Sequence, residues 1–78
     1  MRISFIDTST DSEVFVTASK IEYSHEYNKV FIVRENFVYK SCAIISYDEY
    51  KEMTENLLAY GYLDLSNNSF DCCDTIYI

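Results

Sequence analysis

Apolar residues recur at alternate positions in the first part of this chain, a pattern typical of strands with one buried face. In RISFID, residues 2–7, Ile3 and Phe5 share one side. The next segment, DTSTDS at 7–12, is rich in turn-forming residues. Residues 13–23, EVFVTASKIEY, are rich in β-branched and aromatic side chains. The pattern predicts a first strand, a turn and one long second strand.

Two further strands are predicted in the middle of the chain. The loop SHEYN separates the long strand from KVFIVR at 29–34, so an antiparallel hairpin is the simplest arrangement. Because the residues VFIV form a continuous apolar run, we expect this strand to be central or covered on both faces. ENFVYKSCAII at 35–45 supplies the next strand, with a tight turn at Glu35 and Asn36.

The segment SYDEYKEMTENLLAYG, residues 46–61, predicts an amphipathic helix with both ends specified. Ser46 and Glu49 have the spacing of a capping box, in which the hydroxyl accepts a hydrogen bond from a first-turn amide. Gly61, the only glycine, stands where a left-handed residue would end the helix. At about 100° per residue, the side expected to pack on the sheet is formed by Tyr50, Met53, Leu57 and Tyr60, with Tyr47, Thr54 and Leu58 beside them.

The opposite side of this predicted helix is acidic. It carries Asp48, Glu49, Glu52, Glu55 and Asn56. Lys51 is the only cation of the helix. Carboxylates three or four residues apart, such as Glu52 and Glu55, repel each other at a cost of a few tenths of a kcal/mol per pair. Local helix stability therefore does not account for this surface.

The C-terminal segment adds acidic residues to this picture. It predicts a strand containing Leu63 and Leu65, a turn at 66–69 and a final strand TIYI at 75–78. Its carboxylates, which we treat as a candidate extension of the acidic helix side, are Asp64, Asp71 and Asp74. A third acidic group near the first turn consists of Asp7, Asp11 and Glu13. The sequence alone does not determine whether these three groups meet in space.

These elements predict one α+β domain over residues 1–78, with a small antiparallel sheet of about four or five strands and one amphipathic helix packed on one face. Hydrophobic residues make up 49% of the chain, which places it outside the disordered class. Six Lys and Arg against 13 Asp and Glu give a net charge of 6 − 13 = −7. This charge disfavours direct binding to nucleic acid or to anionic membranes, and it favours a basic partner.

Hydropathy and cysteine usage bear on the compartment. No apolar run reaches the roughly 18 residues that a membrane-spanning helix needs, and MRISFIDTSTD has no apolar stretch of the signal-peptide kind. The three cysteines, Cys42, Cys72 and Cys73, are odd in number, and two are adjacent, which is a poor basis for a disulfide framework. We expect a cytoplasmic protein.

Candidate catalytic and metal-binding residues are few. His25, the only histidine, lies in the predicted loop, where a solvated side chain is the favoured interpretation over a catalytic base. The cysteines could join it around a metal, but an adjacent pair lacks the spacing of zinc ligands. DTSTDSE lacks the carboxylate spacing and central glycine of an EF-hand loop, and one glycine cannot form a phosphate-binding loop. The sequence predicts a non-enzymatic protein without cofactor or metal.

The small size, acidity, scarcity of Gly and Pro, and richness in Ile, Asn and Tyr, together with the helix SYDEYKEMTENLLAYG, resemble small bacteriophage accessory proteins, including anti-CRISPR proteins and uracil-DNA glycosylase inhibitors. This resemblance implies an inhibitor of a host nucleic-acid enzyme, acting in the bacterial cytoplasm. We expect it to block the basic surface of a nucleic-acid-binding defence protein, such as a CRISPR effector, as a DNA mimic. The expected contact residues are Asp48, Glu49, Glu52, Glu55, Asp64, Asp71 and Asp74. The alternative is an assembly module that forms a homodimer or pairs through an exposed strand such as 2–7 or 75–78.

Overall fold

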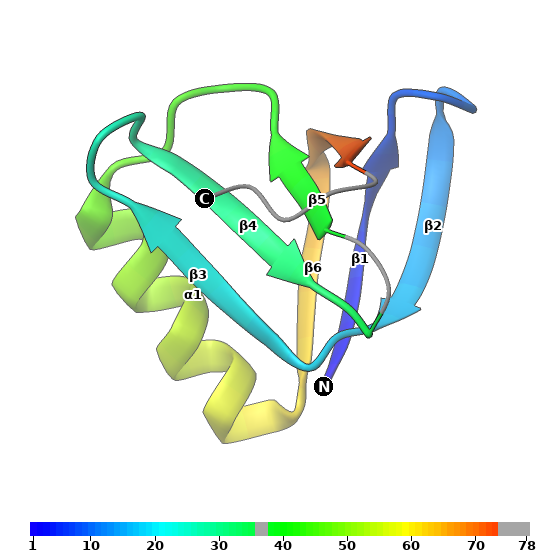
Figure 1. Ribbon diagram of the computed structural model, residues 1–78. Coiled ribbons are helices and arrows are strands. Elements are labelled where there is room, and N and C mark those ends of the chain that lie inside the picture. The colour runs from blue at the N-terminus through cyan, green and yellow to red at the C-terminus, as the bar shows by residue number, and fades with distance from the viewer. Residues whose placement is uncertain (36–37, 74–78) are drawn as a thin grey trace.

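The structure, a computed structural model, describes residues 1–35 and 38–73. Six strands and one helix follow each other along the chain (Figure 1): β1 (Arg2–Asp7), β2 (Ser12–Thr17), β3 (Lys20–Ser24), β4 (Lys29–Val33), β5 (Val38–Ser41), α1 (Tyr47–Tyr60) and β6 (Tyr62–Cys73). Three parts of the sequence predictions, Asn36 of the tight turn, Asp74 and the strand 75–78, lie outside the described residues. Within the described part of the chain, no helix is long and apolar enough to cross a membrane.

The strands form one mixed sheet in the order β2-β1-β6-β5-β4-β3. Neighbouring strands are antiparallel except β1 and β6, which run parallel. The predicted α+β class is confirmed, as are the first strand, the β3–β4 hairpin and the central position of β4. The predicted sheet of four or five antiparallel strands is wrong in its strand count and in the parallel pair, because β6 returns along α1 to lie beside the first strand.

The predicted long strand at 13–23 is two strands on opposite edges of the sheet. At the break, the Ala18 amide donates to the Met1 carbonyl at 2.8 Å, and the Ser19 amide donates to the Val33 carbonyl at 2.8 Å. Two consecutive amides thus donate to opposite halves of the sheet. The first binds the residue before β1, and the second binds the last residue of β4. Only two residues join the edge strands, so the sheet must curl around its core (Figure 1).

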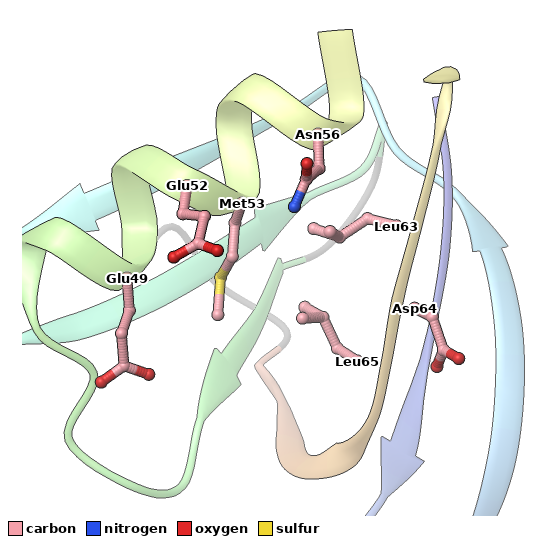
Figure 2. A pocket seen from close by; sticks show the side chains of 7 residues that line it. All are labelled: Glu49, Glu52, Met53, Asn56, Leu63, Asp64 and Leu65. Atoms are coloured by element: carbon pink, nitrogen blue, oxygen red, sulfur yellow. The ribbon is translucent and has the colours of Figure 1, made fainter. Parts of the chain in front are cut away.

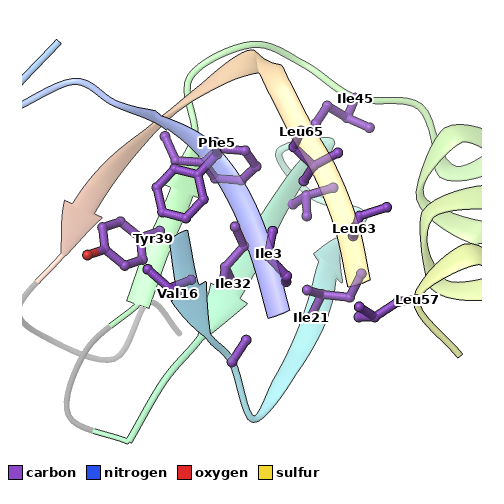
Figure 3. Packing of buried hydrophobic residues seen from close by; sticks show 13 residues of the cluster. Ile3, Phe5, Val16, Ile21, Ile32, Tyr39, Ile45, Leu57, Leu63 and Leu65 are labelled. Atoms are coloured by element: carbon purple, nitrogen blue, oxygen red, sulfur yellow. The ribbon is translucent and has the colours of Figure 1, made fainter. Parts of the chain in front are cut away.

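The core fills the concave side of this curled sheet (Figure 3). Phe5 is fully buried, and its ring centroid lies 4.7 Å from that of Tyr39 and 5.1 Å from that of Phe70. These three residues come from β1, β5 and β6, so the aromatic contacts join strands that are distant in the sequence. The buried cluster consists of Ile3, Phe5, Val16, Ala18, Ile21, Val30, Ile32, Tyr39, Ile45, Leu57, Leu63, Leu65 and Phe70.

Helix α1 packs against β6 and β3 and closes the core. Leu57 is buried in the cluster, with Tyr50 and Met53 packed at its margin. The Tyr50 hydroxyl donates to the Ile21 carbonyl at 3.2 Å, which joins the helix to β3. The predicted apolar side is only partly confirmed, because Leu58 and Tyr60 are 83% and 78% exposed. Leu58 lies about 100° around the helix from the buried Leu57, so its side chain projects away from the sheet.

Both predicted helix ends are confirmed. The Glu49 amide donates to the Ser46 hydroxyl at 3.2 Å, and that hydroxyl lies 3.3 Å from the Glu49 carboxylate. Gly61 has φ = 69°, and its amide donates to the Leu57 carbonyl at 2.8 Å. A left-handed residue at this position turns the chain directly from α1 into β6.

Strand β6 continues through the predicted turn at 66–69. Its pairing with β1 passes from Phe5–Leu65 to Ile6–Ser69, so residues 66–68 are extra residues in a bulge. The Asp64 carboxylate accepts a hydrogen bond from the Ser66 amide at 2.9 Å and holds the start of the bulge. Polar residues that favour a turn therefore form a bulge here, because pairing with β1 on both sides of it and with β5 beyond it keeps the strand in the sheet.

Candidate protein-binding surface

The acidic helix face, which we define as Asp48, Glu49, Glu52 and Glu55, lies on the solvent side of α1. All four residues are exposed, whereas Leu57 on the opposite side is buried. Within residues 1–35 and 38–73, Lys20 and Glu22 form an ion pair at 3.6 Å. No ion pair in this part of the chain involves the acidic helix face. Lys51, on the same helix, lies 5.9 Å from the centre of the Tyr47 ring. The carboxylates are therefore available to a cation supplied by another molecule.

Asp64 does not extend the acidic helix face. Its side chain points to the opposite side of β6 from Leu63 and Leu65 (Figure 2), because successive residues of a strand face opposite ways. There it accepts hydrogen bonds from the Ser66 amide at 2.9 Å and from the Ser4 hydroxyl at 3.2 Å. Ser4 is fully buried, and its hydroxyl is 2.9 Å from that of Tyr62. Asp64 thus has a structural role between β1 and β6.

These hydrogen bonds lower the pKa of Asp64 below its ordinary value, first through the Ser66 amide, then through the Ser66 side chain and Ser4. A lowered pKa in the folded state means that folding favours the carboxylate. Its contribution to stability is complete above the ordinary pKa of about 3.9 and is lost as the pH falls through the lower folded value.

We expect the stability difference between the wild type and Asp64→Asn to narrow as the pH falls from 7 to about 2.5, because acid removes the carboxylate that the substitution also removes. Urea denaturation of both proteins at several pH values measures this difference. A difference that stays constant over this pH range would contradict the stabilising role of the carboxylate.

Asp71 lies at the other end of β6, away from the acidic helix face. Thr8, which follows β1, donates a hydrogen bond to the Asp71 carboxylate. Burial raises the pKa of the nearby Cys42 thiol, and Asp71 raises it further. Asp71 therefore lies near the β1–β2 turn, which carries the acidic group of Asp7, Asp11 and Glu13. Of the predicted contact residues that the structure describes, only the four on α1 are brought together.

A groove that the sequence did not predict lies between α1 and β6 (Figure 2). It has a volume of about 210 Å³ and is lined by Glu49, Glu52, Met53, Asn56, Leu63, Asp64 and Leu65. Two members of the acidic helix face thus border an apolar floor. The helical period placed Glu49, Glu52 and Asn56 on a common side, but it carries no information about which strand lies beside that side.

His25 lies in an aromatic cluster with three tyrosines. Its ring centroid is 5.0 Å from those of Tyr23 and Tyr47, and Tyr23 lies 5.2 Å from Tyr50. The Tyr23 hydroxyl donates to the Ile45 carbonyl at 2.8 Å. The cluster fastens the β3–β4 turn to the start of α1. No group of three or more metal-ligating side chains occurs in the part of the chain that is described.

Comparison with known proteins gives no family assignment: no protein-family model, curated protein sequence or solved structure matches this chain.

Proposed function

We propose that this protein is a non-enzymatic inhibitor that binds a basic surface of a nucleic-acid-binding protein through the acidic helix face of α1. The observation that carries the proposal is that Asp48, Glu49, Glu52 and Glu55 are exposed on one helix and form no ion pair within the described residues. Glu49 also takes part in the helix cap with Ser46, but no such local contact accounts for the row of four carboxylates.

The row of carboxylates on one helix matches a phosphate backbone in the sign of its charge and approximately in its spacing. A helix rises about 1.5 Å per residue, so Asp48 and Glu52 are about 6 Å apart along the axis, and Glu52 and Glu55 about 4.5 Å. Phosphates of one DNA strand follow each other every ~3.4 Å along the duplex axis. A groove of Lys and Arg that holds nucleic acid can therefore pair with several carboxylates of one rigid helix.

The net charge of −7 supports the same proposal through kinetics. An acidic protein is attracted over long range to a basic cleft, and such steering raises the association rate, most strongly at low salt. An inhibitor that competes with nucleic acid benefits from this rate. A host defence protein in the bacterial cytoplasm, such as a CRISPR effector, is the class of target that the resemblance to phage accessory proteins suggests.

Self-association through a strand is the second candidate. Of the two strands named from the sequence, 75–78 lies outside the described residues, and 2–7 is not an edge of the sheet. The segment 2–7 is β1, which lies inside the sheet between β2 and β6. The edges are β2 and β3, and Phe15 on β2 is 64% exposed. A homodimer through β2 would show concentration-dependent sedimentation that persists at high salt.

The proposed function is tested by capture and inhibition. Tagged protein is incubated with nuclease-treated bacterial lysate at low and high salt, and bound proteins are identified by mass spectrometry. We expect a nucleic-acid-binding protein that is released at high salt, and we expect stoichiometric addition of the inhibitor to block its binding to DNA or RNA. Recovery of the bait alone, or of a target that still binds nucleic acid normally, would contradict the proposal.

A further inference from the structure

The groove between α1 and β6 combines an apolar floor with an acidic border. Met53, Leu63 and Leu65 point into it, and Glu49 and Glu52 stand along the helix side (Figure 2). Asn56 lies one turn after Glu52 on the same border. The groove has a volume of about 210 Å³, which is below the roughly 300–1,000 Å³ of sites that bind small molecules. The groove therefore suits a single side chain better than a cofactor.

Backbone groups of β6 add hydrogen-bond acceptors to this groove. The Arg2 amide donates to the Gly61 carbonyl at 3.1 Å, and this bond shows which residues of β6 direct their backbone groups toward β1. Backbone direction alternates along a strand, so the amides and carbonyls of Leu63 and Leu65 point toward β1. The amide and carbonyl of Asp64 point toward the opposite edge of β6. On that edge β5 pairs with β6 only from Phe70 onward. The Asp64 backbone thus lines the groove, although its carboxylate faces the opposite way.

The chemistry of these groups selects the occupant. The exposed carboxylates of Glu49 and Glu52 favour a cation, and the Asp64 carbonyl and the Asn56 amide oxygen offer further hydrogen-bond acceptors. The apolar floor favours an aliphatic stem. Arginine supplies a stem and a planar group with five N–H donors, whereas lysine supplies a compact, strongly hydrated charge with three. Several acceptors spread along a groove therefore match arginine better than lysine.

We propose that the groove between α1 and β6 receives an arginine side chain of the partner protein, with its stem on Met53, Leu63 and Leu65 and its guanidinium between Glu52 and the Asp64 carbonyl. This inference rests on the proposed function, and it identifies the residue of the partner that fixes the complex in one register. The outward carboxylates Asp48 and Glu55 then attract the basic surface, while the groove positions it.

The test uses N-acetyl-arginine-N-methylamide as a probe in a titration of ¹⁵N-labelled protein followed by NMR. We expect saturable shifts of the amides of Met53, Asn56 and residues 63–65, and half-saturation at a concentration about fivefold lower than for the corresponding lysine probe. The neutral citrulline probe should produce no saturable shift at these amides. Equal effects of arginine and lysine, or no saturable shift with arginine, would overturn the proposal.

A variant that fills the groove without changing the charge completes the test. Asn56→Phe places a ring over the floor and should abolish the arginine-induced shifts, whereas Ala59→Phe, an exposed position on the same helix, should retain them. Shifts that survive Asn56→Phe would overturn the assignment to this groove. If the probe fails to bind but a salt-sensitive target is still captured and inhibited, the inhibitor proposal stands and the arginine site is wrong. If the probe binds but no target is captured, the groove binds arginine and the inhibitor proposal is wrong.

Discussion

Replacing Phe5 with Ala is expected to reduce the free energy of unfolding by about 3–5 kcal/mol, the usual cost of removing a buried phenyl ring. Phe5 is 0% exposed, and its ring contacts Tyr39 and Phe70. A cavity at this point would separate β1 from β5 and from the second half of β6. A domain of this size has a total stability of roughly 4–12 kcal/mol, so this loss removes about a quarter of it or more.

Urea denaturation followed by circular dichroism measures this loss. Phe15→Ala is the matched control, because it makes the same substitution on the neighbouring strand β2, where the side chain is 64% exposed. We expect the control to lose less than about 1 kcal/mol. Similar losses of unfolding free energy in both variants would contradict the stabilising role of the aromatic contacts between Phe5, Tyr39 and Phe70.

The double charge reversal Glu52→Lys with Glu55→Lys is expected to weaken binding to the captured target by about 100-fold. Each substitution places a cation where the proposed partner presents cations, and like charges across an interface cost several kcal/mol. The association rate should fall, and the dependence of affinity on salt should become weaker. Both positions are exposed on α1, so the fold should be retained.

Surface plasmon resonance at several salt concentrations measures the rates and the affinity. The matched control is Glu13→Lys with Glu35→Lys, which changes the net charge equally at two exposed positions outside α1. We expect the control to lose less than about fivefold, mainly through slower association. Equal losses in the two double variants would show that net charge alone drives binding, and an unchanged affinity of the α1 variant would remove the acidic helix face as the contact.

Local interactions made parts of this protein predictable from the sequence. The start of α1 at Ser46 depends on a hydroxyl and an amide three residues apart, and its end at Gly61 depends on one left-handed residue. The apolar run in β4 likewise indicates that both faces of this strand are covered, whereas the alternation in β1 did not reveal that Ser4 on its second face is buried too. Such features involve neighbours within one turn or one strand, so sequence spacing describes them directly.

The tertiary structure decided what depends on distant residues. Hydrogen bonds to Met1 and Val33 divided the segment 13–23 at Ala18 and Ser19, although its β propensity is continuous. Pairing with β1 and β5 turned the predicted turn at 66–69 into a bulge and directed Asp64 away from α1. The sequence by itself determined the helix, its acidic side and the sign of the net charge. Only the fold decided which strand lies beside that helix, and therefore that Glu49 and Glu52 border a groove with an apolar floor, because strand order depends on long-range contacts that leave no periodic pattern in the chain.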